Sequence, residues 1–522
     1  MQPPTDGCRL VFDIGKTNKK IVLFHGREPV HIEKQEFPEI DHDGIRTEPV
    51  QELARWFLGL LPSLARRHRV NTIAVCSHGG AFAAVNAAGE LVAPVFSYLN
   101  QPDVSVIRDF KALAGDPHEL YRTTCTPPME KSINMALGFM NACALYPQLR
   151  HEADAVLSLP DYFVMLLSGT RYTTMTYLGC HTYLWDFQKW SWSKVARAIG
   201  YAALAPEPIK RSGKSTRLLE AWHTRIGDDR PVRVMPGLHD SNASIIPYLI
   251  KYAQRFCLHS TGSWCVTMVP ADTPQLSPQD IQNNILYNIS VEHKPVKTHT
   301  FPGGILLSRN VERIKRIDRT FSEAQTDVTI LQRIIAQAEW FYVPAVADLH
   351  EVVVDSNRPF LPDQFLEQLS CERSDAERTA AEYYALVVIG VALAVHDAIR
   401  GFDFSAVEQM YVEGGFGSNR QYLSVLAALM PEVALRTTDI TEATALGASL
   451  YVDYAMPDNA DAVGLWESKA VDTGVVDQRD LQQYRLKWRR LYEPSLARSS
   501  ISRFNASISS PLMGITSPIL WD

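Results

Sequence analysis

The chain has 522 residues, of which 46% are hydrophobic and 21% charged, and its formal net charge is −7 at pH 7. This length exceeds what one hydrophobic core usually supports, so we expect two large domains with the composition of an ordinary soluble globular protein. The negative charge argues against nucleic acid or an anionic membrane surface as the main partner.

The cysteines and the N-terminus indicate the cellular compartment. The eight cysteines form no C-x-x-C pair, and several, such as Cys76 and Cys257, lie in apolar runs, where cysteine behaves as a small hydrophobe. The N-terminal segment lacks the charge and apolar pattern of a signal peptide. No stretch approaches the roughly 18 uninterrupted apolar residues that a membrane helix needs. We therefore predict a reduced, cytoplasmic protein.

The first half alternates strands and helices. Residues 9–24 are predicted to form a strand, a polar turn at 13–20 and a second strand. Helices are predicted at 49–69, 103–114, 131–150 and 161–169, and a strand at 72–77. Residues 231–244 are typical of a short strand leading into a helix, with Asp240 and Ser241 as candidate N-caps.

The second half repeats this organisation. A strand, a polar turn and a strand recur at 255–269, about 245 residues after the first unit, which indicates a duplicated domain. Further elements are a long helix at 374–400, a strand, glycine loop and helix over 408–430, and a small-residue helix at 441–455. The alternation predicts an α/β fold. From 457 a helical stretch precedes a serine-rich tail, for which we predict no structure.

Two familiar motifs are excluded. The strand at 72–77 ends at Ser77, His78, Gly79 and Gly80, which could be an esterase oxyanion loop, but the chain lacks the G-x-S-x-G nucleophile turn that such an enzyme needs. The Gly15–Lys16–Thr17 turn is no P-loop, because a strand follows it instead of a helix.

A different set of residues suits phosphoryl transfer. Two donor-rich turns, one in each half, can hold a triphosphate between domains without a P-loop. The bare backbone of the 413–419 loop allows a planar ring to approach closely. Asp240 is an isolated carboxylate in a polar turn and a candidate base for a hydroxyl proton.

Seven segments occur in one characteristic order along the chain: DIGKTNKK (13–20), LVAPVFSY (91–98), LPDYFVMLLSG (159–169), PGLHDSNAS (236–244), STGSW (260–264), EGGFGSN (413–419) and EATALGAS (442–449). In these segments and their order the chain resembles the FGGY carbohydrate kinases, which are members of the actin-like, ribonuclease-H-like ATPase superfamily. Its motifs HDSNAS and STGSW are most similar to the rhamnulokinase and fuculokinase branch.

The resemblance implies an α/β fold with two actin-like domains flanking a central nucleotide and sugar cleft. The N-terminal domain would span 1–247, with the catalytic base at its end. The nucleotide-binding C-terminal domain would span 248–456, followed by a helical extension and tail over 457–522.

The resemblance also assigns roles to residues. Asp240 matches the general base, and Asp13 matches the carboxylate that reaches Mg²⁺ through water. Asp161, Glu442 and Gly447 are expected to serve the structure. The residues that match the ATP site are Gly15, Lys16, Thr17, Asn18, Lys20, Thr261, Gly262, Ser263, Gly414, Gly415, Gly417, Ser418 and Asn419.

Several of these roles have structural alternatives. Asp240 could act only as a helix cap, and Lys20 could be a solvated surface lysine. Individual glycines of the 413–419 loop could serve only the turn. Lys16 replaces a threonine that is usual in the family, so its contact would be charged.

The sugar side departs from the family. Many members carry Trp-x-Asp-x-Arg, whereas Tyr98, Asn100 and Pro102 stand here, which should change the selection among sugar hydroxyls. The histidines of this region could equally be structural. The predicted substrate contacts are His78, Gly79, Gly80, Tyr98, Asn100, His239 and Asp240.

The predicted activity is ATP-dependent phosphorylation of a small free ketose, such as a 6-deoxyketohexose or a ketopentose, with Mg²⁺ as cofactor. The alternatives are a kinase of a polyol or an aldose, and a non-catalytic or chaperone-like actin-fold ATP switch, which would need neither a sugar pocket nor a base. The oligomeric state stays open, with a homodimer as one option.

Overall fold

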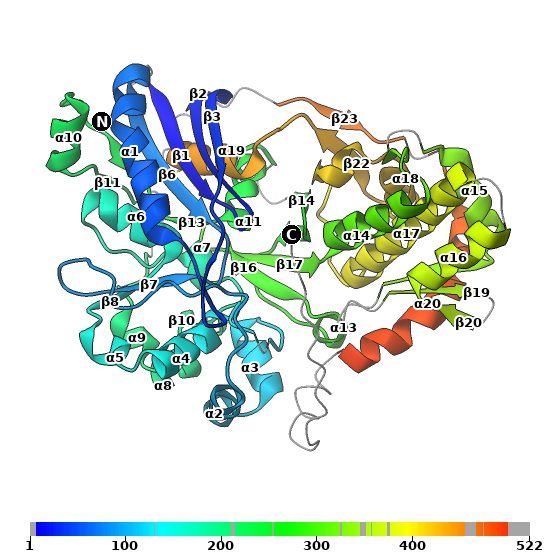
Figure 1. Ribbon diagram of the computed structural model, residues 1–522, viewed down its shortest axis with the longest axis horizontal. Coiled ribbons are helices and arrows are strands. Elements are labelled where there is room, and N and C mark those ends of the chain that lie inside the picture. Colours follow the sequence, from blue (N-terminus) through cyan, green and yellow to red (C-terminus); the bar gives the residue numbers. More distant parts are fainter. Residues whose placement is uncertain are drawn as a thin grey trace.

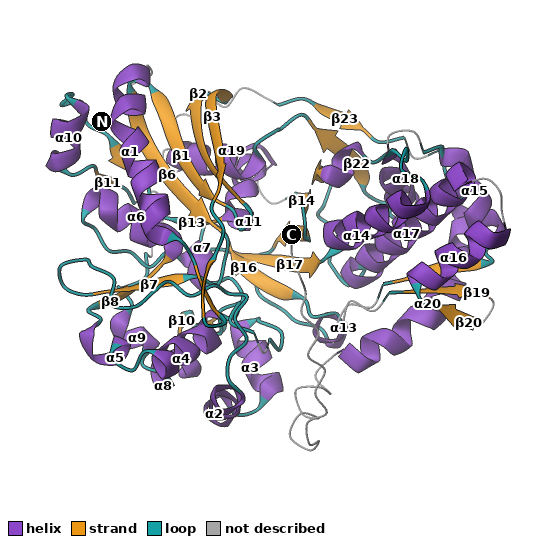
Figure 2. Ribbon diagram, in the orientation of Figure 1, coloured by secondary structure: helices purple, strands orange, loops and turns teal. Residues whose placement is uncertain are grey.

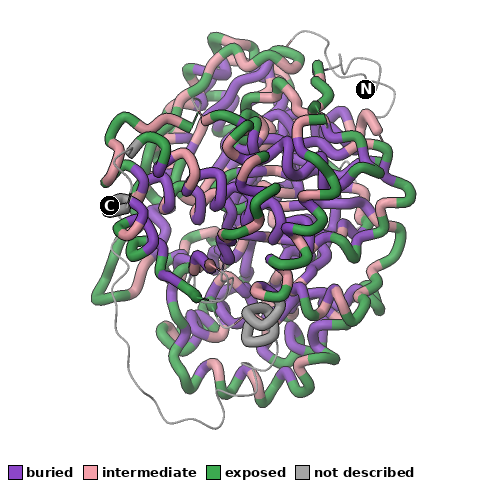
Figure 3. The backbone as a smooth tube through the Cα atoms, turned by 90° about the vertical axis from the view of Figure 1, so that its right-hand side faces the viewer, coloured by how far each residue is buried: buried purple, intermediate pink, exposed green. Residues whose placement is uncertain are grey.

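The computed structural model describes residues 7–499 except 130, 210–213, 253–254, 324–325, 345–350, 356–357, 373–375, 455–465 and 473. Two large mixed β-sheets, each flanked by helices, form the left and right halves of the molecule (Figures 1 and 2). Buried residues fill the interior of the molecule (Figure 3). The serine-rich tail predicted to lack structure lies outside the described residues.

The first sheet has the strand order β11-β12-β6-β1-β2-β3, and β13 also pairs with β6. Strand β1 runs antiparallel to β2 and parallel to β6. The strands are β1 (Cys8–Ile14), β2 (Asn18–His25), β3 (Glu28–Glu36), β6 (Val70–Ser77), β11 (Thr216–Arg217), β12 (Arg233–Val234) and β13 (Leu238–His239).

The centre of strand β1, from Leu10 to Phe12, is apolar because helices cover both faces of the strand. Leu10 and Phe12 pack toward α1 and α6, where the Phe12 ring stacks on Phe57 with centroids 4.3 Å apart. Val11 faces the opposite core, which α11, α12 and α19 complete. The helices around this sheet are α1 (Val50–His68), α6 (Leu159–Ser168), α10 (Glu220–Ile226), α11 (Asp240–Ser244), α12 (Ile246–Tyr252) and α19 (Ala443–Tyr454).

A helical region is attached below the first sheet (Figure 1). Its core includes Tyr287 and Ile289 of β16, so it also contacts the second sheet. Its elements are β4 (Ile40–His42), β5 (Ile45–Thr47), β7 (Phe82–Val85), β8 (Ala155–Ser158), β9 (Trp185–Asp186), β10 (Ser191–Trp192), α2 (Val104–Ala114), α3 (Pro117–Thr124), α4 (Met135–Leu145), α5 (Leu149–Glu152), α7 (Met175–Leu178), α8 (Lys194–Ala198) and α9 (Tyr201–Leu204). The helical segment predicted at about 131–150 is shorter and divided: α4 ends before Pro147, because the residue preceding proline disfavours helical backbone, and α5 follows.

The second sheet has the order β16-β17-β15-β14-β21-β22-β23. Strand β14 runs antiparallel to β15 and parallel to β21, the same arrangement as β1 with β2 and β6. The strands are β14 (Phe256–Thr261), β15 (Cys265–Pro270), β16 (Leu286–Ile289), β17 (Pro295–Phe301), β21 (Gln409–Gly414), β22 (Ala434–Thr438) and β23 (Ser468–Ala470).

Helices pack around the long helix α17 of the second half. Residues 377–399 of this helix are long and apolar enough to cross a membrane, but the most apolar stretch of the helix is buried inside the protein. The other elements here are α13 (Pro278–Gln282), α14 (Gly303–Ile317), α15 (Val328–Gln337), β18 (Trp340–Val343), β19 (Val352–Asp355), β20 (Arg358–Phe360), α16 (Pro362–Glu372), α17 (Ala376–Ile399), η2 (Gly415–Ser418), α18 (Arg420–Leu429) and α20 (Gln478–Ser499).

Two segments cross the predicted domain limits. Helix α19, expected within the second domain, packs against α11, β1 and β6 of the first half. The segment after 457 contributes β23 to the second sheet, and α20 adds Tyr484 and Trp488 to its core.

Candidate active site

Three polar segments meet where parallel strands of the first sheet end. Asp13 of β1 lies beside Cys76 of β6, and His239 of β13 lies beside Ser77. Because β1, β6 and β13 run parallel, their carboxyl ends lie at one edge, where α/β proteins commonly place ligands. The structure therefore brings Asp13, His78 and Asp240 together.

Asp240 is the first residue of α11. His239 holds the N-cap position without a side-chain capping bond, so the expectation of Asp240 or Ser241 as N-cap is wrong. The Asp240 carboxylate accepts a hydrogen bond from the Ser241 backbone N–H at 2.6 Å. Burial raises the pKa of Asp240, and the nearby His78 opposes this rise. Its side chain keeps 30% of its surface exposed, so a substrate hydroxyl can reach it.

Asp13 and Lys20, which are predicted to face the phosphates, lie close together at this edge. Burial, opposed by Lys20, raises the pKa of Asp13 to about 6, and the repulsion from Asp240 and Glu442 adds to this rise. The Lys20 ammonium donates to Glu442 at 2.7 Å and is 23% exposed, so it is an ordered group rather than a free surface lysine. Carboxylates that repel each other in this way fit Mg²⁺, a hard cation that prefers oxygen ligands.

Lys16 and Asn100 make contacts that the sequence did not indicate. The Lys16 ammonium lies 2.6 Å from Glu48 and 4.5 Å from the centre of the Tyr98 ring. The side chain therefore points toward the sugar side, and its predicted phosphate contact stays a prediction. The Asn100 amide donates to the Arg46 carbonyl at 2.7 Å and accepts from the Arg46 N–H at 2.9 Å, so it holds β5.

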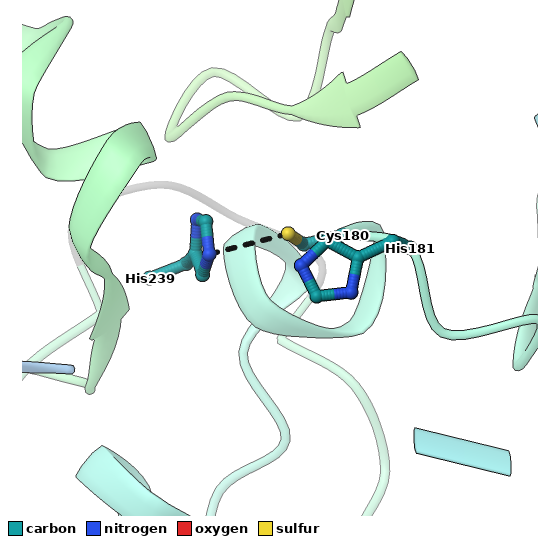
Figure 4. Close-up of side chains that lie close together, drawn as sticks. All are labelled: Cys180, His181 and His239. Carbon is teal, nitrogen blue, oxygen red and sulfur yellow. Dashed lines mark hydrogen bonds between the residues drawn. The ribbon is translucent and has the colours of Figure 1, made fainter. Parts of the chain in front are cut away.

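His239 belongs to a buried cluster with Cys180 and His181 (Figure 4). The Asn242 amide donates to the Thr176 carbonyl at 3.0 Å and lies 3.3 Å from Nδ1 of His239, which assigns the ring proton to Nε2. This Nε2–H lies 3.3 Å from both the Cys180 sulfur and the Asp240 carboxylate. The cluster is compact enough for a metal ion, but a protonated nitrogen that faces it fits hydrogen bonding instead.

His181 is a site residue that sequence reasoning missed. It has left-handed backbone, with φ of +38°, which is rare for a residue other than glycine. Its Nδ1–H donates to the Ile133 carbonyl at 3.2 Å, so Nε2 is a hydrogen-bond acceptor. Burial lowers the pKa of His181 to about 4, which keeps the ring neutral. No motif in the sequence marks this position.

Alanine at Gly79 is expected to displace both histidine rings. An added Cβ would lie 2.9 Å from Nε2 of His181 and 3.1 Å from Nε2 of His239. We expect Gly79→Ala to raise the KM for the sugar about tenfold and to leave the KM for ATP unchanged. Gly59→Ala is the control, because nothing lies within 4 Å of that added Cβ. An unchanged sugar KM in Gly79→Ala would contradict the placement of these rings beside the substrate.

The second half contains a cavity of about 970 Å³ between the two predicted nucleotide loops. Predicted ATP-site residues that line it are Gly262, Ser263, Gly415, Ser418 and Asn419. Missed lining residues include Gly304, Arg309 and Tyr384, which come from helices without a recognisable motif.

Three predicted ATP-site residues of the second half, Thr261, Gly414 and Gly417, are not among the residues that line the cavity. The buried Thr261 hydroxyl donates to the Glu413 carbonyl and accepts from the Phe416 N–H at 3.0 Å, so it ties the two loops together. Gly414 has φ of +77°, and Gly417 packs against the Val412 carbonyl. Their contacts are with the loops themselves.

Comparisons with known proteins find similarity to carbohydrate kinases. Residues 253–460 match the family model described as carbohydrate kinase FGGY, C-terminal domain. A rhamnulokinase from Halalkalibacterium halodurans is 27% identical over 136 residues, which are 25% of this chain and 27% of that protein. The chain thus matches only about a quarter of the length of this relative.

Solved structures cover the chain more fully. A carbohydrate kinase from Novosphingobium aromaticivorans has a TM-score of 0.76 at 25% identity, covering 94% of this chain and 99% of that one. A xylulose kinase from Lactobacillus acidophilus also has a TM-score of 0.76, at 14% identity, covering 95% of this chain and all of that one. The predicted α/β fold with two actin-like domains is confirmed.

Proposed function

We propose that the chain is a member of the FGGY carbohydrate kinases, whose C-terminal-domain model matches residues 253–460, and that it transfers the γ-phosphoryl group of ATP to a hydroxyl of a small free sugar. The observation that carries the proposal is the position of Asp240. This carboxylate is 30% exposed, and it is close enough to both His78 and Asp13 to interact with them electrostatically.

The proposed reaction uses these residues directly. Asp240 accepts the proton of the sugar hydroxyl as its oxygen attacks the γ-phosphorus, and ADP leaves. Lys20 balances the phosphate charge, and the amides of the two donor-rich turns hold the phosphate oxygens. Asp13 would hold Mg²⁺ through its water shell, and when bound this ion neutralises phosphate charge.

The nucleotide is proposed to occupy the cavity of the second half. Helix α14 begins at Gly303 beside this cavity, and its Gly304 packs against the carbonyl of Gly262. The helix dipole favours an anion near such a terminus. Measurements of ATP binding test the roles proposed for the predicted nucleotide-site residues.

We further propose a ketose as substrate, namely a 6-deoxyketohexose or a ketopentose, and a cytoplasmic location. The test is ADP release with a panel of ketoses, aldoses and polyols. We expect at least one ketose to stimulate ADP release strongly in the presence of Mg²⁺. ATP turnover that no sugar changes would contradict the proposal and favour an actin-fold ATP switch. Light scattering of the same preparation tests the homodimer.

A further inference from the structure

Two buried polar atoms beside Tyr98 have no hydrogen-bond partner among the described residues. They are Oε2 of Glu48 and Nε2 of His78. The Glu48 side chain is fully buried and that of His78 is 6% exposed, and the two groups are neighbours, with Oε1 of Glu48 3.6 Å from Nε2 of His78. Buried polar atoms are rarely left unpaired in native proteins, so a missing partner is expected here.

The chemistry of both atoms identifies this partner as a donor. Nδ1 of His78 donates to the Gly79 carbonyl at 3.1 Å, which leaves the lone pair of a neutral ring on Nε2. A carboxylate oxygen is also an acceptor. The His78 and Tyr98 rings meet edge to face, with centroids 5.3 Å apart, so both acceptors border the predicted sugar-stacking ring. Hydroxyl groups of a sugar would satisfy them.

Lys16 places a cation at the same point. Its ammonium contacts Glu48 at 2.6 Å and the Ser97 hydroxyl at 3.0 Å, and it lies over the Tyr98 ring. The 98–102 segment contains no charged residue. Glu48 and Lys16, from other parts of the chain, therefore supply a carboxylate and a cation beside Tyr98. The three N–H groups of this ammonium are used by Glu39, Glu48 and Ser97, so Lys16 acts by fixing the Glu48 carboxylate.

The charge of this region selects against anions. Three carboxylates, those of Glu39, Glu48 and Asp240, lie in this region, and Glu39 and Glu48 both contact Lys16. Lys16 already pairs with two of these carboxylates. A substrate with its own carboxylate would meet net negative charge in a region of low dielectric.

We propose that Glu48, held by Lys16, is the specificity determinant of the sugar site: it accepts a hydroxyl of a neutral polyhydroxy substrate and excludes sugar acids. This inference rests on the proposed kinase function. Glu48 is a binding residue in this scheme and takes no proton from the reacting hydroxyl.

Glu48→Gln tests the proposal, with Glu52→Gln on the exposed face of α1 as the matched control. For the best neutral sugar of the panel we expect Glu48→Gln to raise KM at least about tenfold, with the KM for ATP within about twofold of wild type. The preference in kcat/KM for this sugar over gluconate should fall by about tenfold or more. Glu52→Gln should change neither value.

A second variant covers a failure of Glu48→Gln to fold, which thermal unfolding would reveal. Lys16→Met keeps the side-chain stem and is expected to raise the KM for the sugar more than that for ATP. A folded Glu48→Gln with unchanged sugar KM and unchanged preference overturns the inference, as does Lys16→Met if only the KM for ATP rises. A wild-type protein that phosphorylates no sugar refutes the proposed function instead.

Discussion

Replacing Asp240 with asparagine is expected to lower kcat by about 10²–10⁴-fold while ATP binding is retained. The amide keeps the size of the carboxylate and can still accept the hydrogen bond from the Ser241 N–H, but it cannot take up the proton of the attacking hydroxyl. The cavity proposed for the nucleotide is lined by residues of the other half of the molecule and should be unaffected. Sugar-dependent ADP release measures kcat, and calorimetric titration measures ATP affinity.

Asp116→Asn is the control for this variant. Asp116 caps α3 on the surface, where asparagine caps equally well, so turnover and stability should be unchanged. A near-normal kcat in Asp240→Asn would show that Asp240 is not the base. Lost ATP binding would show that the substitution disturbs more than the proton transfer.

The sequence predicts the strand ends of the site well. His78 follows the apolar run of β6, Asp13 is the penultimate residue of β1, and Asp240 follows the short strand β13. Their meeting at one sheet edge follows from parallel pairing with β6, which the alternation of strands and helices already indicates. The α/β fold and the repeated strand unit are predictable for the same reason.

Other parts of the site depend on contacts between distant segments and leave no local pattern. Glu48 lies between a short strand and a helix, and only the fold brings it to Lys16 and His78. The left-handed backbone of His181 is invisible in a sequence that lacks glycine at that position. The sequence also does not predict that α19 packs on the first sheet, because its small residues suit burial against either half of the molecule.

The glycines of the 413–419 loop are expected to differ sharply in what alanine does to them. At Gly414 the backbone has φ of +77°, and an added Cβ would overlap the carbonyl oxygen of Thr261. Strain and overlap together should lower the free energy of unfolding by about 3 kcal/mol or more. Thermal unfolding with and without ATP measures this loss.

A substitution at Gly415, the next residue, tests contact with the nucleotide without disturbing the structure of the loop. Nothing lies within 4 Å of a Cβ added there, yet the residue lines the cavity. Gly415→Ala should therefore keep wild-type stability and raise the KM for ATP by about three- to tenfold, since the methyl group occupies space proposed for the nucleotide. If Gly415→Ala leaves the KM for ATP unchanged, the nucleotide does not use this wall of the cavity. If Gly414→Ala is as stable as wild type, the Gly414–Thr261 contact does not hold the two loops together.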